Sequence, residues 1–267
     1  MTTIRPAAVA GMFYPGNADM LAQDLDAMLV DAESRAPGLV PKALIVPHAG
    51  YIYSGPIAAT AYALLKPMAH TIRRVILLGP THRVAVRGLA LPGTDAFATP
   101  LGTVNIDQDA VRRIAQLPQV TVSPQAHALE HSLEVHLPFL QTLLPDFTLL
   151  PLAVGMASAE EVAEVLEAVW GGPETLIVVS SDLSHYLPYD AAMTTDSNTA
   201  KAILCLEQTV THQQACGGTP INGLVAAARH HGMTPHLIDL RNSGDTAGDR
   251  SRVVGYGAFV FTEASHD

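Results

Sequence analysis

Short runs of apolar residues, each followed directly by a turn with polar side chains, limit what this chain can fold into. Three of these runs, at residues 43–46, 75–78 and 176–179, are uninterrupted and rich in Leu, Ile and Val. Strands buried on both faces of a parallel sheet have this character, whereas strands with one solvated face alternate apolar and polar residues. Helical patterns lie between the runs. The sequence therefore predicts an α/β protein with a central, mostly parallel sheet flanked by helices.

Local signals place the other elements. From periodicity, capping patterns and proline placement, helices are expected over residues 19–32, from about 56, and over 108–116, 158–170 and 219–231. The helix at 158–170 opens with a capping box of Ser158 and Glu161. Shorter strands are expected at 88–93 and 102–106, and final strands at 235–240 and 253–261. Because no repeat or linker interrupts this order, we expect one domain over residues 1–267.

The charge balance excludes some classes of partner. The chain carries 25 acidic and 15 basic residues, a formal net charge of −10, and the basic residues are scattered. This disfavours an electrostatic surface for nucleic acid or anionic membranes. No apolar stretch of about 18 residues occurs and no charged and apolar leader is present, so we expect neither a membrane span nor a signal peptide, and a cytoplasmic location.

Two histidines and a cysteine are candidate metal ligands. His48 and His82 each follow a predicted buried strand and a proline, and Cys216 lies in a loop before a predicted helix. The helix dipole there favours the thiolate, which is the metal-binding form. Two imidazoles and one thiolate leave coordination positions open, as catalytic sites do, and they suit iron(II), copper or zinc. The alternatives are hydrogen-bonded turn histidines and a buried thiol that packs as a small apolar residue.

A second pair of residues suits proton transfer. Asp182 and His185 follow the apolar run at 176–179, and a carboxylate near an imidazole can fix its tautomer. The alternative is that Asp182 caps a helix. Phe13 and Tyr53 are candidates for aromatic walls of a substrate pocket.

The segment 130–138 is the densest cluster of His and Glu. His131 and His136 are five residues apart, so they do not match the zinc-protease helix motif. Glu130 and Glu134 share one face at helical spacing. We expect Glu130, His131 and Glu134 to support the metal ligands, with one or both carboxylates accepting the second N–H of a metal-binding imidazole. A solvated helix start is the alternative.

Five segments, taken together and in order, resemble the Memo family, whose microbial members are called AmmeMemoRadiSam system protein B. They are residues 11–15, 47–55, 79–82, 130–138 and 181–185, and the resemblance runs from about residue 5 to 262. It implies a fold similar to the LigB-type class III extradiol dioxygenases. It also implies that His48, His82 and Cys216 match the metal-binding positions.

The resemblance further matches Asp182 and His185 to a pocket pair, and Phe13 and Tyr53 to pocket aromatics. It suggests a link with an AMMECR-type protein and a radical-SAM protein. One departure matters, because the dioxygenases of similar fold complete their iron site with a carboxylate where this chain has Cys216. Fold similarity alone does not carry their reaction over.

The leading hypothesis is a metal-dependent oxidoreductase, a non-haem iron(II) dioxygenase acting on a small aromatic or catechol-like substrate. In it, His48, His82 and Cys216 hold the metal, and His185, oriented by Asp182, moves the proton. One alternative is a non-enzymatic adaptor that binds a metal or peptide in the same pocket. Another is a hydrolase in which zinc activates water.

Overall fold

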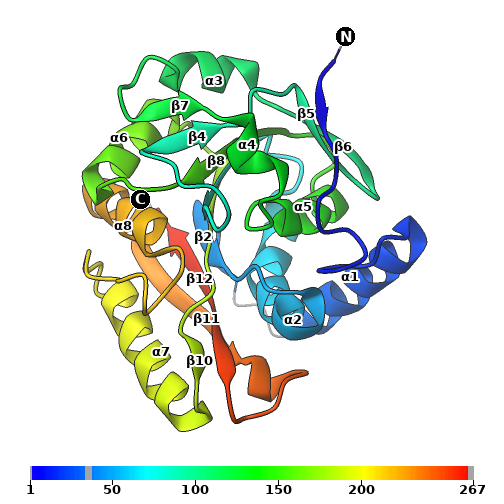
Figure 1. Ribbon diagram of the computed structural model, residues 1–267, viewed down its shortest axis with the longest axis vertical. Helices are drawn as coiled ribbons and strands as arrows, with labels where there is room; N and C mark the ends of the chain where they lie inside the picture. The colour runs from blue at the N-terminus through cyan, green and yellow to red at the C-terminus, as the bar shows by residue number, and fades with distance from the viewer. Residues whose placement is uncertain (1, 34–37, 264–267) are drawn as a thin grey trace.

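The computed structural model describes residues 2–33 and 38–263, and a nine-stranded sheet runs through this part of the chain (Figure 1). In spatial order the strands are β10 (His185–Leu187), β12 (Val253–Thr262), β2 (Ala43–Val46), β9 (Thr175–Ser180), β3 (Arg74–Pro80), β8 (Thr148–Val154), β4 (Leu89–Leu91) and β7 (Val120–Val122), and β11 (Thr234–Asn242) pairs with β12.

The sheet is parallel in its centre and antiparallel towards both sides. Strands β2, β9, β3 and β8 pair in parallel, whereas β12 runs antiparallel to β2, and β4 runs antiparallel to β8. The three apolar runs of the sequence form β2, β3 and β9, which lie side by side. The predicted α/β class with a central parallel sheet is confirmed, and the complete sheet is mixed.

Helices cover both faces of the sheet. The helices α1 (Ala18–Glu33), α2 (Tyr51–Tyr62) and α5 (Leu137–Leu143) lie on one face, and α6 (Ala159–Val169) and α8 (Gly218–His230) lie on the other (Figure 1). Alternate residues of a strand serve the two cores: Leu44 and Val46 pack towards the first group, and Ala43 and Ile45 towards the second. This explains why these strands are apolar without interruption.

The remaining elements lie around this framework. They are α3 (Gln108–Ile114), α4 (Pro124–Ala128), α7 (Tyr189–Leu204) and the short 3-10 helices η1 (Ala63–Met68), η2 (Glu134–His136) and η3 (Ser243–Asp245). A separate three-stranded sheet contains β1 (Ile4–Arg5), β5 (Ala96–Thr99) and β6 (Gly102–Asn105). Of the two short strands expected after β3, the first therefore joins the central sheet and the second joins this small sheet.

Local structure differs from expectation at two helix starts. Helix α2 begins at Tyr51, so Pro56 lies inside it; the carbonyl that loses a partner belongs to Ile52, which is 69% exposed and open to water. Helix α8 begins after Gly217, which has no side chain to cap it, so Thr219 lies inside the helix, where its hydroxyl pairs with His212. The capping box of Ser158 and Glu161 is confirmed.

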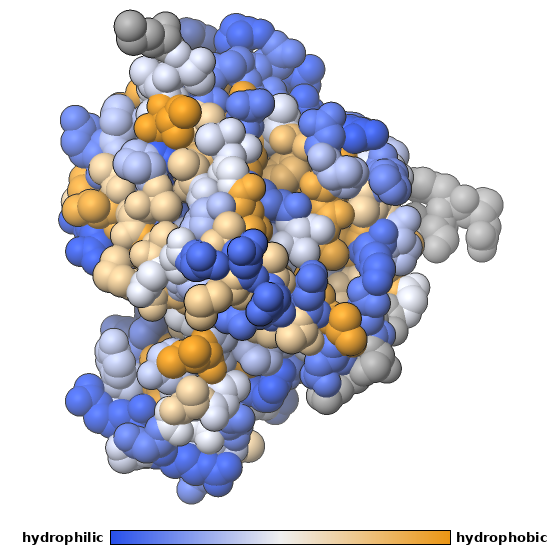
Figure 2. Space-filling model, turned by 90° about the vertical axis from the view of Figure 1, so that its right-hand side faces the viewer, coloured by the Kyte–Doolittle hydropathy of each residue, from blue (hydrophilic) through white to orange (hydrophobic). Residues whose placement is uncertain are grey.

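Apolar and hydrophilic residues are interspersed on the face drawn in Figure 2. Among the described residues, the helices are too short or too polar to cross a lipid bilayer.

Candidate metal centre

The candidate site lies at the carboxyl ends of three neighbouring parallel strands. The chain leaves β2 towards His48, β3 towards His82 and β9 towards Asp182. In open α/β sheets this edge is where ligands bind. These three turns lie close together because β9 lies between β2 and β3 in the sheet.

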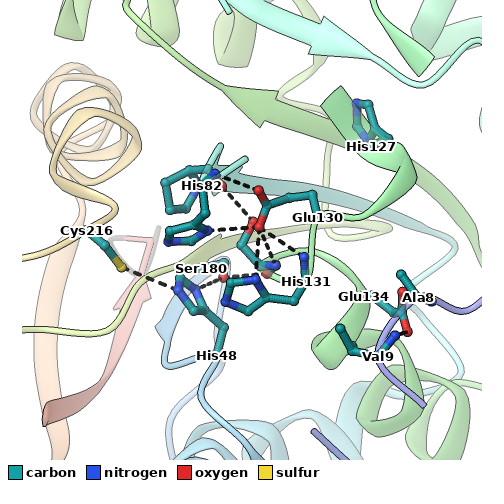
Figure 3. A network of polar contacts seen from close by, with 12 residues as sticks. Ala8, Val9, His48, His82, His127, Glu130, His131, Glu134, Ser180 and Cys216 are labelled. Atoms are coloured by element: carbon teal, nitrogen blue, oxygen red, sulfur yellow. Dashed lines mark hydrogen bonds and ion pairs between the residues drawn. The ribbon is translucent and has the colours of Figure 1, made fainter. Parts of the chain in front are cut away.

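Three imidazoles face one another there. One ring nitrogen from each of His48, His82 and His131 lies within 4.8 Å of the others (Figure 3). Ring centroids are 5.2 Å apart for His48 and His82, 5.3 Å for His48 and His131, and 4.6 Å for His82 and His131. Rings that bind one metal at about 2.1 Å have centroids roughly 4.5 to 5.2 Å apart at angles of about 90° to 110°. The rings thus have nearly the spacing of ligands to a shared metal ion.

The thiol of Cys216 approaches the same group from the loop before α8. Its Sγ lies 3.3 Å from Nε2 of His48 (Figure 3). A thiolate and an imidazole bound to one metal at about 2.3 and 2.1 Å are roughly 3.1 to 3.6 Å apart. Burial and the charge of Asp182 raise the pKa of the Cys216 thiol to about 12, opposite to the lowering expected from the helix dipole. A bound cation would offset this effect by favouring the thiolate.

A serine fixes the tautomer of His48. The Ser180 hydroxyl donates to the carbonyl of Ser132 at 2.6 Å, so its oxygen accepts from Nδ1–H of His48, also at 2.6 Å. The lone pair of Nε2 is therefore directed at the cluster. Burial, together with the neighbouring histidines, lowers the pKa of His48 well below its usual value. His48 is thus neutral at pH 7 and available as a ligand.

Glu130 orients the other two rings. Its Oε1 lies 2.8 Å from Nδ1 of His82 and 3.2 Å from Nδ1 of His131, and it also accepts from the backbone N–H of Ser132. Burial alone would raise the pKa of Glu130, but the hydrogen bonds and charge of His82 hold it down to about 2. The carboxylate leaves the Nε2 atoms of both rings facing the cluster. Glu130 thus contacts two of the three clustered imidazoles, and its role in supporting metal ligands stays a prediction.

His131 and Glu134 lie differently from what the sequence suggested. His131 lies among the possible ligands rather than behind them, with its ring against Phe13 at 4.7 Å. Glu134 points away from these histidines (Figure 3). It accepts its hydrogen bonds from residues of the N-terminal segment instead: Arg5, Ala8, Val9 and Tyr14. Residues 131–136 form a turn and a 3-10 helix, so Glu130 and Glu134 do not share the helical face on which the expectation rested.

Asp182 and His185 are both present but are not hydrogen-bonded to each other. Oδ1 of Asp182 accepts from the backbone N–H of His48 at 2.7 Å, and burial raises the pKa of this carboxyl. Nδ1 of His185 donates to the carbonyl of Leu183 at 2.8 Å, which leaves Nε2 as the acceptor. Leu183, rather than Asp182, thus orients His185. Asp182 does not cap a helix, since the short strand β10 follows it.

These groups open into a cavity of about 650 Å³. Phe13, Tyr53 and Tyr256 form aromatic parts of its wall, and His48, His82, His131, Asp182 and His185 line it as well. Sequence reasoning found Phe13 and Tyr53 but missed Tyr256, whose only signal is its place in the last strand. It also missed Ser180, which looked like the end of an apolar run.

Comparisons with known proteins assign the chain to a family. The model of the "Memo-like protein" family matches residues 5–260. A MEMO1 family protein of Aquifex aeolicus is 36% identical over 270 residues, covering 97% of this chain and 99% of the relative. One of Archaeoglobus fulgidus is 37% identical over 279 residues, with the same two coverages.

The chain belongs to the Memo family. Among solved structures, an uncharacterized protein of Escherichia coli K12 matches with a TM-score of 0.50 and 14% sequence identity. The match covers 80% of this chain and 98% of that protein, and it shows a shared fold alone.

Proposed function

We propose that this protein is a metal-dependent oxidoreductase acting on a small aromatic, catechol-like substrate. His48, His82 and Cys216 hold a divalent metal, with iron(II) preferred. The observation that carries the proposal is the group of three imidazoles at one wall of an aromatic-lined cavity, with the Cys216 thiol 3.3 Å from Nε2 of His48. Iron(II) held there would supply the redox chemistry with dioxygen that protein side chains lack. Copper and zinc also suit these donors.

The ligand set has one open choice, between Cys216 and His131. His48 and His82 belong to either set, since both have Nδ1 hydrogen-bonded and Nε2 directed at the cluster. The resemblance to the Memo family and the 3.3 Å contact with His48 support Cys216 as the third donor. In this proposal His131 is not a metal ligand, and it accepts a hydrogen bond from the bound substrate instead.

The remaining residues would bind the substrate and move its proton. Phe13, Tyr53 and Tyr256 offer apolar faces on which an aromatic ring can stack and which exclude water. Nε2 of His185 has no hydrogen-bond partner among residues 2–33 and 38–263, so it can take a proton from a substrate hydroxyl in the same cavity. Asp182, held against the backbone of His48, supplies the negative charge that stabilises the protonated imidazole.

Metal analysis after anaerobic loading with iron(II) tests the ligand set. His48→Gln and Cys216→Ser are expected to lose bound iron, His131→Gln to retain it, and the exposed His70→Gln control to match wild type. Retention by Cys216→Ser together with loss by His131→Gln would replace the proposed set with the three histidines.

Oxygen uptake by the iron-loaded protein with a panel of catechols tests the reaction. Uptake that requires both iron and His185 supports the proposal. A fully loaded protein that consumes no oxygen with any of these substrates would refute the dioxygenase activity and leave a metal-binding protein or, with zinc, a hydrolase.

A further inference from the structure

The rim of the metal-centre cavity carries a positive charge that nothing described so far uses. Arg252 is the single arginine or lysine among the described residues that line this cavity. In residues 2–33 and 38–263 its guanidinium has no carboxylate within ion-pair distance. By contrast, nearby Arg250 lies 3.8 Å from Asp245 and does not line the cavity. The charge of Arg252 is therefore free to meet a ligand.

The two carboxylates of the cavity do not compete for this charge. Asp182 is 5% exposed and accepts from the backbone of His48. Asp249 accepts from both the backbone N–H and the hydroxyl of Ser251. The backbone N–H of Arg252 also hydrogen-bonds to Asp249, but neither carboxylate forms an ion pair with the guanidinium of Arg252, although both belong to the same cavity lining.

Tyr186 holds Arg252 at the rim. The guanidinium lies over the Tyr186 ring, 5.1 Å from its centroid, and this ring is 5.8 Å from that of His185. Arg252 is thus linked through one aromatic side chain to the proposed proton acceptor. Stacking on a ring leaves the edge of the guanidinium, with its fork of N–H donors, available to a ligand.

The backbone at Tyr186 is strained in a way that serves this placement. Its φ is +59°, in the left-handed region that side chains other than glycine rarely adopt, and the residue is 63% exposed. The pairing of β10 with β12 is irregular at this point, between His185 and Leu187. Bulges of this kind redirect side chains next to functional sites. Tyr186 is too exposed to pack in the core, and its ring contacts Arg252 on the solvent side of the cavity.

We propose that Arg252 determines substrate specificity by binding a carboxylate, so that the ligand of this cavity is a small aromatic acid. The planar guanidinium matches a carboxylate with two parallel hydrogen bonds. The aromatic walls then cover the ring of the ligand, and its hydroxyl groups face the histidines. This inference rests on the proposed function for its choice of an aromatic ligand, but not on any turnover.

Binding of two matched probes tests it. We would titrate 3,4-dihydroxybenzoate and its neutral analogue 3,4-dihydroxybenzamide into zinc-loaded protein by calorimetry, where no oxidation is needed. Wild type is expected to bind the acid about tenfold more tightly, the lower end of the range for a hydrogen bond to a charged group. Arg252→Gln should remove the preference and leave the affinity for the amide unchanged. Arg252→Lys should restore part of it.

Arg250→Gln is the matched control, because it removes a stacked arginine two positions away that lies outside the cavity lining. It should keep the wild-type preference. Equal affinity of wild type for the two probes, binding of neither, or an unchanged preference in Arg252→Gln would overturn the inference.

The same titrations separate this inference from the proposed function. If zinc and iron do not bind, the ratio of the two affinities is measured on the metal-free protein. A tenfold ratio that Arg252→Gln abolishes then supports Arg252 while the metal proposal fails. Loss of oxygen uptake with the ratio intact refutes only the oxidoreductase activity.

Discussion

Replacing Glu134 by glutamine should destabilise the protein strongly, although Glu134 does not touch the candidate metal centre. Its side chain is fully buried, and its two oxygens accept four hydrogen bonds. Oε2 accepts from Arg5 at 2.6 Å and from the backbone of Ala8 at 2.8 Å, while Oε1 accepts from the backbone of Val9 at 2.9 Å and from Tyr14 at 2.6 Å. The carboxylate thus ties the N-terminal segment, which carries Phe13, to the segment after His131.

The expected size follows from these contacts. A glutamine can keep its oxygen towards Arg5 and Ala8, and the Tyr14 hydroxyl can rotate to accept from the new amide. The N–H of Val9 is then left facing another donor, which costs about 1–3 kcal/mol. Arg5, only 4% exposed, loses its counter-charge as well. Breaking a buried ion pair from one side costs about 3–5 kcal/mol in total, and we expect a loss in this range.

Urea unfolding of the wild type and of Glu134→Gln at pH 7 measures this loss. Lys66→Gln is the control, because it breaks an ion pair with Glu33 in which the lysine is 62% exposed, and it should change stability by at most about 1 kcal/mol. If Glu134→Gln lowers the free energy of unfolding by less than about 1 kcal/mol, the assignment of Glu134 as the anchor of the N-terminal segment is wrong.

Three further changes have clear expected outcomes. Glu130→Gln should weaken metal binding about 10- to 100-fold in a competition assay with a chelator, because Glu130 contacts two of the clustered imidazoles. The control Glu167→Gln removes a separate contact, between Glu167 and His231, and should leave metal binding unchanged. Gly217→Ala should lower stability by about 1–3 kcal/mol and weaken metal binding, because a Cβ there would lie 2.7 Å from the carbonyl oxygen of Ser180, which ends β9. The control Gly38→Ala places its Cβ in open space and should not change stability. Equal melting temperatures of the two variants would contradict the prediction. Burial lowers the pKa of His127 from 6.5 to about 4, so the unfolded chain takes up this proton first on acidification and stability falls as the pH drops from 6.5 to 4. His127→Gln should reduce that fall by about 3 kcal/mol in urea unfolding at several pH values, and an unchanged pH slope would contradict the burial argument.

The sequence predicted the framework of the site well, because its signals there are local. An apolar run such as residues 43–46 needs no long-range information to indicate a buried strand, and the polar residue that follows it must lie at the edge of the sheet. His48 and His82 were found in this way. Glu130 was found as a supporting residue, but its equivalence with Glu134 assumed a helix. The turn and 3-10 geometry of 131–136 sends the two carboxylates in different directions.

Other features depend on segments that only the folded chain brings together. The pKa of Cys216 was expected to fall because of the helix that follows it, but burial and Asp182 raise it, and neither is visible in the local sequence. Arg252 had no signal at all, since its role depends on a bulge in β10 about 66 positions earlier.

The sequence by itself determined the α/β class, the family and the strand ends that supply His48 and His82, because hydrophobic patterning and turn residues act over a few positions. The tertiary structure decided which donors face one another, which carboxylate orients them and which charge stands at the rim of the cavity. Such contacts join side chains that are far apart in the sequence, and their distances depend on backbone geometry such as the left-handed turn at Tyr186, which local sequence patterns do not reveal.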